Sequence, residues 1–199
     1  MLEAIIDSAC PNCGGPISTR RLELGLPCKA CLPLDDRKFH ELAKLDWTSR
    51  VKSVSETLKR LNSLNGYSKI FKVVKELEEF EEFFRKVTGN KLWSAQRTWA
   101  KRLIMGRSFA IIAPTGVGKT TFMIVYSLYQ VLKGKKVYFI VPTKVLVDHV
   151  TSLLLKHIER NKLKVKVLAF TSKCRDSSKL YEELEEGNFQ ILITTSQFL

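Results

Sequence analysis

The sequence lacks any apolar run long enough to span a membrane, and it lacks a signal peptide at its start. A membrane-spanning helix needs about 20 consecutive, predominantly apolar residues, whereas the apolar 45% of this 199-residue chain is interspersed with polar residues. The segment Met1–Asp7 is short and acidic, unlike the basic and apolar start of a secretory leader. We therefore expect a cytoplasmic protein without a membrane partner. The same apolar content suffices for a packed core, which excludes a disordered chain.

Acidic residues are scarce in the C-terminal half of the chain. Residues 91–199 hold eighteen basic and seven acidic side chains, a net charge of +11, whereas residues 1–33 are neutral and residues 34–90 carry +2. Nearly all of the overall charge of +13 therefore lies on one module. Such a surface favours a polyanionic partner, although a solvated, lysine-rich surface is an alternative interpretation.

Cysteine is rare, and four of the five cysteines form two CxxC pairs near the N-terminus. Fourteen residues separate the pair Cys10 and Cys13 from the pair Cys28 and Cys31. Each pair turns two thiolates toward one point, and two such turns complete a tetrahedral Zn²⁺ site. Four thiolates leave no open position, so the predicted site is structural. Two disulfides are the competing interpretation, which a cytoplasmic protein disfavours; the fifth cysteine, Cys174, is expected to have no role.

The middle of the chain is expected to form a helical connector. Apolar residues recur at steps of three and four from Trp47 to Leu61, on one face of a helix. The turn-forming stretch 62–66 interrupts the pattern, and a second helix continues to about residue 88. We thus predict a zinc ribbon or knuckle at 1–33, a connector at 34–90 and a nucleotide-binding domain at 91–199.

A phosphate-binding loop is the most specific feature of the sequence. The run Ala-Pro-Thr-Gly-Val-Gly-Lys-Thr at 113–120 lies between an apolar and an amphipathic segment, which is the strand–loop–helix context that this loop requires. Gly116 and Gly118 allow successive N–H groups to point at phosphates. Lys119 would reach the β- and γ-phosphates of ATP, and the Thr120 hydroxyl would ligate Mg²⁺, so both have catalytic roles. The residues expected to contact the nucleotide from this loop are Thr115, Gly116, Val117, Gly118, Lys119, Thr120 and Thr121.

Strands and helices alternate through the C-terminal part of the chain. We expect strands at 108–113, 136–141, 164–170 and 189–194, and helices at about 119–132, 144–159 and 177–186. This alternation predicts an α/β fold with a parallel sheet covered on both faces. Ligands gather at the carboxyl ends of such strands, which is where the phosphate loop, residues 142–146 and residues 194–196 fall.

The upstream residue Gln96 joins these motifs into a recognisable set. Its amide offers a donor and an acceptor that match the N6 and N7 edge of adenine. A Gln before AxTGxGKT, followed by PTxxLV at 142–147, resembles the first RecA-like domain of superfamily-two helicases. By this resemblance Gln96 reads adenine, and the backbone of one nucleic-acid strand is contacted by Pro142, Thr143, Lys144, Thr194 and Thr195.

The order of the modules resembles, more narrowly, the N-terminal end of reverse gyrase, the ATP-dependent topoisomerase of hyperthermophiles that introduces positive supercoils into DNA. A four-cysteine module leads through helices into residues 93–122, the most specific block. The resemblance implies ATP, Mg²⁺ and Zn²⁺ as cofactors and DNA as a partner. It also implies a second RecA-like domain and a topoisomerase domain, in the same polypeptide or in a separate chain. One departure is Asp148-His149, where related helicases often have Gln.

The sequence also lacks an acidic pair at the end of an apolar strand, which a helicase ATPase needs to hold Mg²⁺ and to orient water. After Thr121 the only aspartates are Asp148 and Asp176, and the glutamates from Glu182 to Glu186 lie in a polar helix. We therefore expect an incomplete RecA-like domain, a fragment or a truncated reading frame, that binds ATP and DNA weakly without useful turnover. The alternatives are another zinc-bearing superfamily-two DNA or RNA helicase and a non-enzymatic module that binds zinc and nucleic acid.

Overall fold

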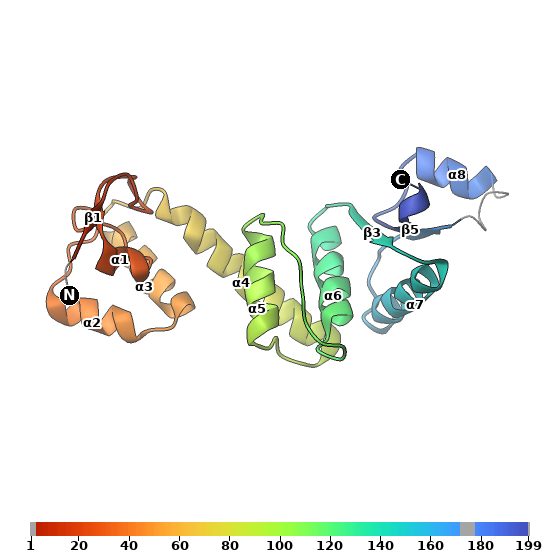
Figure 1. The fold of residues 1–199 in the computed structure, drawn as a ribbon, viewed down its shortest axis with the longest axis horizontal. Helices are drawn as coiled ribbons and strands as arrows, with labels where there is room; N and C mark the ends of the chain where they lie inside the picture. The colour runs from red at the N-terminus through yellow and green to blue at the C-terminus, as the bar shows by residue number, and fades with distance from the viewer. Residues whose placement is uncertain (1–2, 172–177, 199) are drawn as a thin grey trace. The chain divides into compact units, whose positions relative to one another are not determined.

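The computed structural model describes residues 3–171 and 178–198 of the chain (Figure 1). The backbone divides into two compact units, unit 1 at Met1–Glu79 and unit 2 at Phe80–Leu199. The division falls within helix α4 (Tyr67–Thr88), while the predicted domain boundaries after residues 33 and 90 stay predictions. Among the described residues, no helix is both long enough and apolar enough to cross a membrane.

Unit 1 combines a small hairpin with helices. Strands β1 (Ile5–Ile6) and β2 (Ile17–Ser18) pair antiparallel, with Ile6 opposite Ile17. Aspartate side chains cap the start of two of the helices by accepting hydrogen bonds from backbone N–H groups of the first turn: Asp35 from Lys38 and Asp46 from Thr48. The helices are α1 (Thr19–Glu23), α2 (Asp36–Lys44), α3 (Trp47–Arg60) and α4.

The predicted apolar stripe on α3 is confirmed except at its last member. Val51, Val54 and Leu58 are buried, but Leu61 is 48% exposed. The helix ends at Arg60, so the chain turns before Leu61 can complete the stripe. The core of unit 1 also draws on the cysteine-bearing segment, since Leu26 and Leu32 are packed with the residues of the stripe.

Unit 2 contains a parallel three-stranded sheet with the order β3–β5–β4. Val137 and Val167 both lie opposite Ile191 on the central strand, so the predicted α/β fold is confirmed. Helices α6 and α7 share one core with Ile191 and Ile193, and α8 packs by Tyr181 and Leu184 in a second core that contains Leu192. The elements are α5 (Ser94–Ile104), α6 (Lys119–Leu132), β3 (Val137–Val141), α7 (Lys144–Arg160), β4 (Val167–Phe170), α8 (Ser178–Glu185), β5 (Ile191–Thr195) and a short 3-10 helix, Ser196–Phe198.

The prediction of a strand at 108–113 is wrong for this structure. The segment pairs with none of the described strands, and both edges of β5 are already occupied by β3 and β4. Burial still alternates along the segment as it would in a strand, because Phe109 and Ile111 are half-buried whereas Ile112 is 97% exposed. A β-strand needs a neighbour that accepts its hydrogen bonds, and an apolar run by itself cannot supply that neighbour.

An aromatic cluster holds α4 against α6 within unit 2. Phe80 is fully buried, and its ring centroid lies 5.9 Å from that of Phe122 and 5.2 Å from those of Tyr126 and Tyr129. Trp99 of α5 joins the cluster through Phe122, at 5.4 Å. These edge-on and tilted contacts fix the helices that carry the candidate nucleotide site.

Candidate zinc centre and phosphate-binding site

The four N-terminal cysteines converge on one point. Their Sγ atoms all lie within 4.8 Å of one another, and those of Cys13 and Cys28 are 3.7 Å apart. A tetrahedral Zn²⁺ with bonds of about 2.3 Å would separate its sulfurs by about 3.8 Å. A disulfide would require about 2.05 Å, and all four thiols are free. The geometry thus fits one zinc ion held by Cys10, Cys13, Cys28 and Cys31, and it does not fit two disulfides.

Backbone N–H groups donate to two of the sulfur atoms of this centre. The N–H of Gly15 donates to Cys13 Sγ at 3.3 Å, and the N–H of Cys28 donates to Cys10 Sγ at 3.2 Å. Burial raises the pKa of Cys10, but hydrogen bonds from surrounding N–H groups outweigh it and bring that pKa to about 6. Burial raises the pKa of Cys31 to about 12. Burial also raises the pKa of Cys28. A metal ion bound here would therefore have to displace protons from these two thiols.

The two glycines of the phosphate loop adopt the backbone conformation that was predicted to turn successive N–H groups inward. Gly116 and Gly118 have φ angles of +84° and +80°, in the left-handed region that other residues rarely adopt. Helix α6 begins directly after Gly118, so the positive end of its dipole faces the loop. Lys119 Nζ donates to the carbonyls of Ala113 and Pro114, each at 2.6 Å. The ammonium group would have to leave these carbonyls in order to meet a phosphate.

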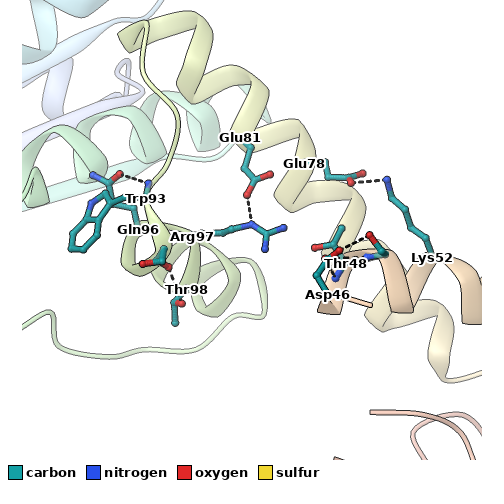
Figure 2. Close-up of polar contacts among 11 residues, drawn as sticks. Asp46, Thr48, Lys52, Glu78, Glu81, Trp93, Gln96, Arg97 and Thr98 are labelled. Carbon is teal, nitrogen blue, oxygen red and sulfur yellow. Dashed lines mark hydrogen bonds and ion pairs between the residues drawn. The ribbon is translucent and has the colours of Figure 1, made fainter. Parts of the chain in front are cut away.

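Gln96 ties the start of α5 to the phosphate loop. The side chain is 5% exposed, its Oε1 accepts from the Trp93 N–H and its Nε2 donates to the Gly118 carbonyl, both at 3.4 Å. Figure 2 shows the contact with Trp93 and the pairing of Arg97 with Glu81 of α4. The structure therefore brings together two motifs that lie 22 residues apart in the sequence.

A cavity of about 520 Å³ lies beside this contact, within the range of small-ligand sites. The sequence did not identify an aromatic side chain for this site. Trp93 lines the cavity and is 44% exposed, whereas Phe84 is 3% exposed and belongs to the aromatic cluster. The remaining lining residues are Thr88, Asn90, Lys91, Gln96, Gly116, Val117, Gly118 and Thr121.

The residues predicted to contact nucleic acid fall into two groups. Pro142, Thr143 and Lys144 are exposed after β3, where the Thr143 hydroxyl caps α7 by accepting from the Leu146 N–H at 3.3 Å. Thr194 and Thr195 are only 2% and 4% exposed, and their hydroxyls have no hydrogen-bond partner among the described residues. Contact of either group with DNA stays a prediction.

Three further sequence expectations concern side chains away from these sites. Asp148 lies exposed on α7, and Cys174 and Asp176 lie outside the described residues. In the part of the chain that the structure describes, the four N-terminal cysteines form the cluster suited to a metal ion.

Gln96 is thus bonded to a glycine-rich loop at the start of a helix, and PTxxLV follows the next strand of the parallel sheet, which is the order of motifs expected of a helicase. The chain belongs to the DEAD/DEAH box helicase family, whose family model matches residues 93–199. A second family model, the reverse gyrase zinc finger, matches residues 1–49.

The relatives narrow this class and confirm the resemblance to reverse gyrase. Reverse gyrase of Pyrobaculum aerophilum is 42% identical over 193 residues, or 96% of this chain and 15% of the relative. Reverse gyrase 1 of Aquifex aeolicus is 39% identical over 200 residues, and reverse gyrase of Pyrococcus furiosus is 40% identical over 200 residues. Both of these matches cover 100% of this chain and 16% of the relative. The chain thus spans about a sixth of the length of these reverse gyrases.

Proposed function

We propose that unit 2 binds ATP with Mg²⁺ and that it serves as part of the nucleotide-driven motor of a reverse gyrase. The observation that carries the proposal is the contact of Gln96 with the phosphate loop beside a cavity of about 520 Å³. A base in this cavity would lie next to the loop that binds its phosphates. One arrangement would therefore hold both the base and the phosphates of a nucleotide.

Each loop residue has a role in this proposal. Lys119 releases the carbonyls of Ala113 and Pro114 and pairs with the β- and γ-phosphates, while the Thr120 hydroxyl ligates Mg²⁺. Gln96 reads the adenine edge. The exposed indole of Trp93 supplies an apolar face for the base.

DNA is the polyanionic partner in this proposal. The charge of +11 on residues 91–199 supports it, as does the exposure of Pro142, Thr143 and Lys144 at the carboxyl end of β3. Contacts of this kind hold a phosphate backbone and read no sequence. The match to a reverse gyrase zinc finger favours a supercoiling enzyme over another zinc-bearing helicase or a passive binding module.

Titration with a fluorescent ADP in the presence of Mg²⁺ tests nucleotide binding. Lys119→Ala should weaken binding by about tenfold or more, because charge-assisted hydrogen bonds contribute about 1.5–3 kcal/mol each. Lys135→Ala removes an equal charge from an exposed site after α6 and should bind like the wild type. Equal affinities for the wild type and Lys119→Ala would contradict the proposal and favour an idle loop.

A further inference from the structure

The turn that joins α3 to α4, here called the connector turn (residues 61–67), is bonded to the first cysteine pair. Asn12 lies between Cys10 and Cys13 and is only 4% exposed. Its Nδ2 donates to the Ser63 carbonyl at 2.9 Å. Its Oδ1 accepts from the N–H groups of Asn65 at 2.9 Å and Tyr67 at 3.3 Å. One amide side chain thereby satisfies three backbone groups of the connector turn.

The backbones also approach closely at this point. The Gly66 N–H donates to the Asn12 carbonyl at 2.9 Å. A Cβ atom at Gly66 would lie 2.9 Å from the carbonyl oxygens of both Asn12 and Pro11, a distance that real Cβ contacts essentially never show. Gly66 does not have a positive φ, so the approach of the CxxC backbone, rather than local conformation, requires a glycine here.

The connector turn reaches the second cysteine pair as well. The Ser63 hydroxyl donates to the Cys31 carbonyl at 3.3 Å. At the end of the connector turn, where α4 begins, the Tyr67 hydroxyl donates to the Gly25 carbonyl at 3.1 Å. Segments that flank the metal ligands on both sides are therefore bonded to a turn more than 30 residues further along the chain.

We propose that the connector turn is an outer shell of the zinc centre and that Asn12 and Gly66 are positioning residues for its ligands. The CxxC loops have little core of their own, so contacts that hold them in place lower the cost of arranging four thiolates. The coupling is reciprocal, because an element that favours zinc binding is itself ordered when zinc binds. The connector turn lies beyond residues 1–49, which match the zinc-finger family.

Competitive zinc titration of the 199-residue chain against a chromophoric chelator tests the proposal. Asn12→Ala and Gly66→Ala should each weaken zinc binding by about 10- to 100-fold, the usual effect of losing an outer-shell partner. Lys69→Ala, at an exposed site in the first turn of α4, should bind zinc like the wild type. Ser63→Ala removes the long hydroxyl bonds to the Cys31 and Leu58 carbonyls but keeps every bond of Asn12, so it provides a milder variant if the others fail to fold.

Amide hydrogen exchange gives a readout that does not depend on the variants. Exchange at Asn65, Gly66 and Tyr67 should accelerate when zinc is removed from the wild-type chain and slow again when zinc is restored. Two results would overturn the proposal. The first is that Asn12→Ala and Gly66→Ala bind zinc with wild-type affinity, even if their melting temperatures are lowered. The second is that the rate of amide exchange at the connector turn is the same with and without zinc.

Discussion

Single side chains in this protein satisfy backbone groups that the fold would otherwise leave unpaired. Arg50 donates to carbonyls in the last turn of α2 or directly after α1 and α2, namely those of Leu24, Leu42, Ala43 and Leu45. Asn12 performs the same task for the connector turn. These side chains therefore join segments that lie far apart in the sequence within unit 1.

Tyr67 provides a test of this role through pH. The side chain is fully buried, and burial raises its pKa to about 12 despite the nearby Arg50. The folded state favours the neutral phenol, so its contribution is complete below the ordinary pKa of 10.0 and is lost as pH rises toward about 12. We expect wild-type stability to fall by up to about 2–3 kcal/mol over this interval relative to Tyr67→Phe.

Urea unfolding followed by circular dichroism at pH 7, 10 and 11.5 measures this difference. At pH 7 the variant should be about 0.5–1.5 kcal/mol less stable, because it loses the hydrogen bond to Gly25. Parallel curves for the two proteins across the whole pH range would show that Tyr67 does not titrate as described.

The sequence predicted the zinc ligands but not the residues that position them. Cys10, Cys13, Cys28 and Cys31 are recognisable because metal-ligand spacing is a local property. Asn12 bonds to partners 51 and 53 residues away, and no spacing rule connects such positions. Trp93 was missed for a similar reason, since its exposure beside the phosphate loop depends on how α5 packs.

At the scale of the elements, helix packing rather than the sheet supports the candidate nucleotide site. Phe80 of α4 contacts Phe122, Tyr126 and Tyr129 of α6, and α6 begins at the phosphate loop. Phe80→Ala should destabilise unit 2 by about 3–5 kcal/mol, because the cavity removes contacts from all of these rings. Phe80→Leu keeps more of the volume and should cost clearly less.

Chemical denaturation of both variants, monitored by near-ultraviolet circular dichroism of the aromatic cluster, checks this prediction. Equal stabilities for Phe80→Ala, Phe80→Leu and the wild type would mean that the cluster does not fix α4 against α6. A second readout is nucleotide affinity, which should fall in Phe80→Ala if α4 and α6 shape the cavity together.

Three of the four strands predicted in unit 2 are present among the residues that the structure describes, and one is not. Strands β3, β4 and β5 were predicted because β-branched, apolar runs alternate with amphipathic helices. The same reasoning assigned a strand to residues 108–113, which have an equally suitable composition. Pairing depends on a neighbouring strand, and none of the described strands pairs with this segment. The composition of residues 108–113 therefore predicted an extended apolar segment, but it could not predict whether another strand would pair with it.

At the scale of the whole molecule, we expect weak or absent ATP turnover by this chain alone. The only aspartate on a described element after the phosphate loop is Asp148, on α7, and an ATPase of this kind needs a carboxylate to hold Mg²⁺ and orient water. Phosphate release measured with and without DNA should stay far below that of an intact helicase. A DNA-stimulated rate comparable with such an enzyme would contradict this expectation.

The central claim is that this chain supplies nucleotide binding to an enzyme that supercoils DNA. The most direct test joins the chain to the remaining length of its Pyrobaculum aerophilum relative, which it matches at 42% identity, and measures the linking number of a relaxed plasmid by two-dimensional gel electrophoresis. We predict positive supercoils that require ATP and disappear in Lys119→Ala. A plasmid that is only relaxed, or a product unchanged by Lys119→Ala, would contradict the claim.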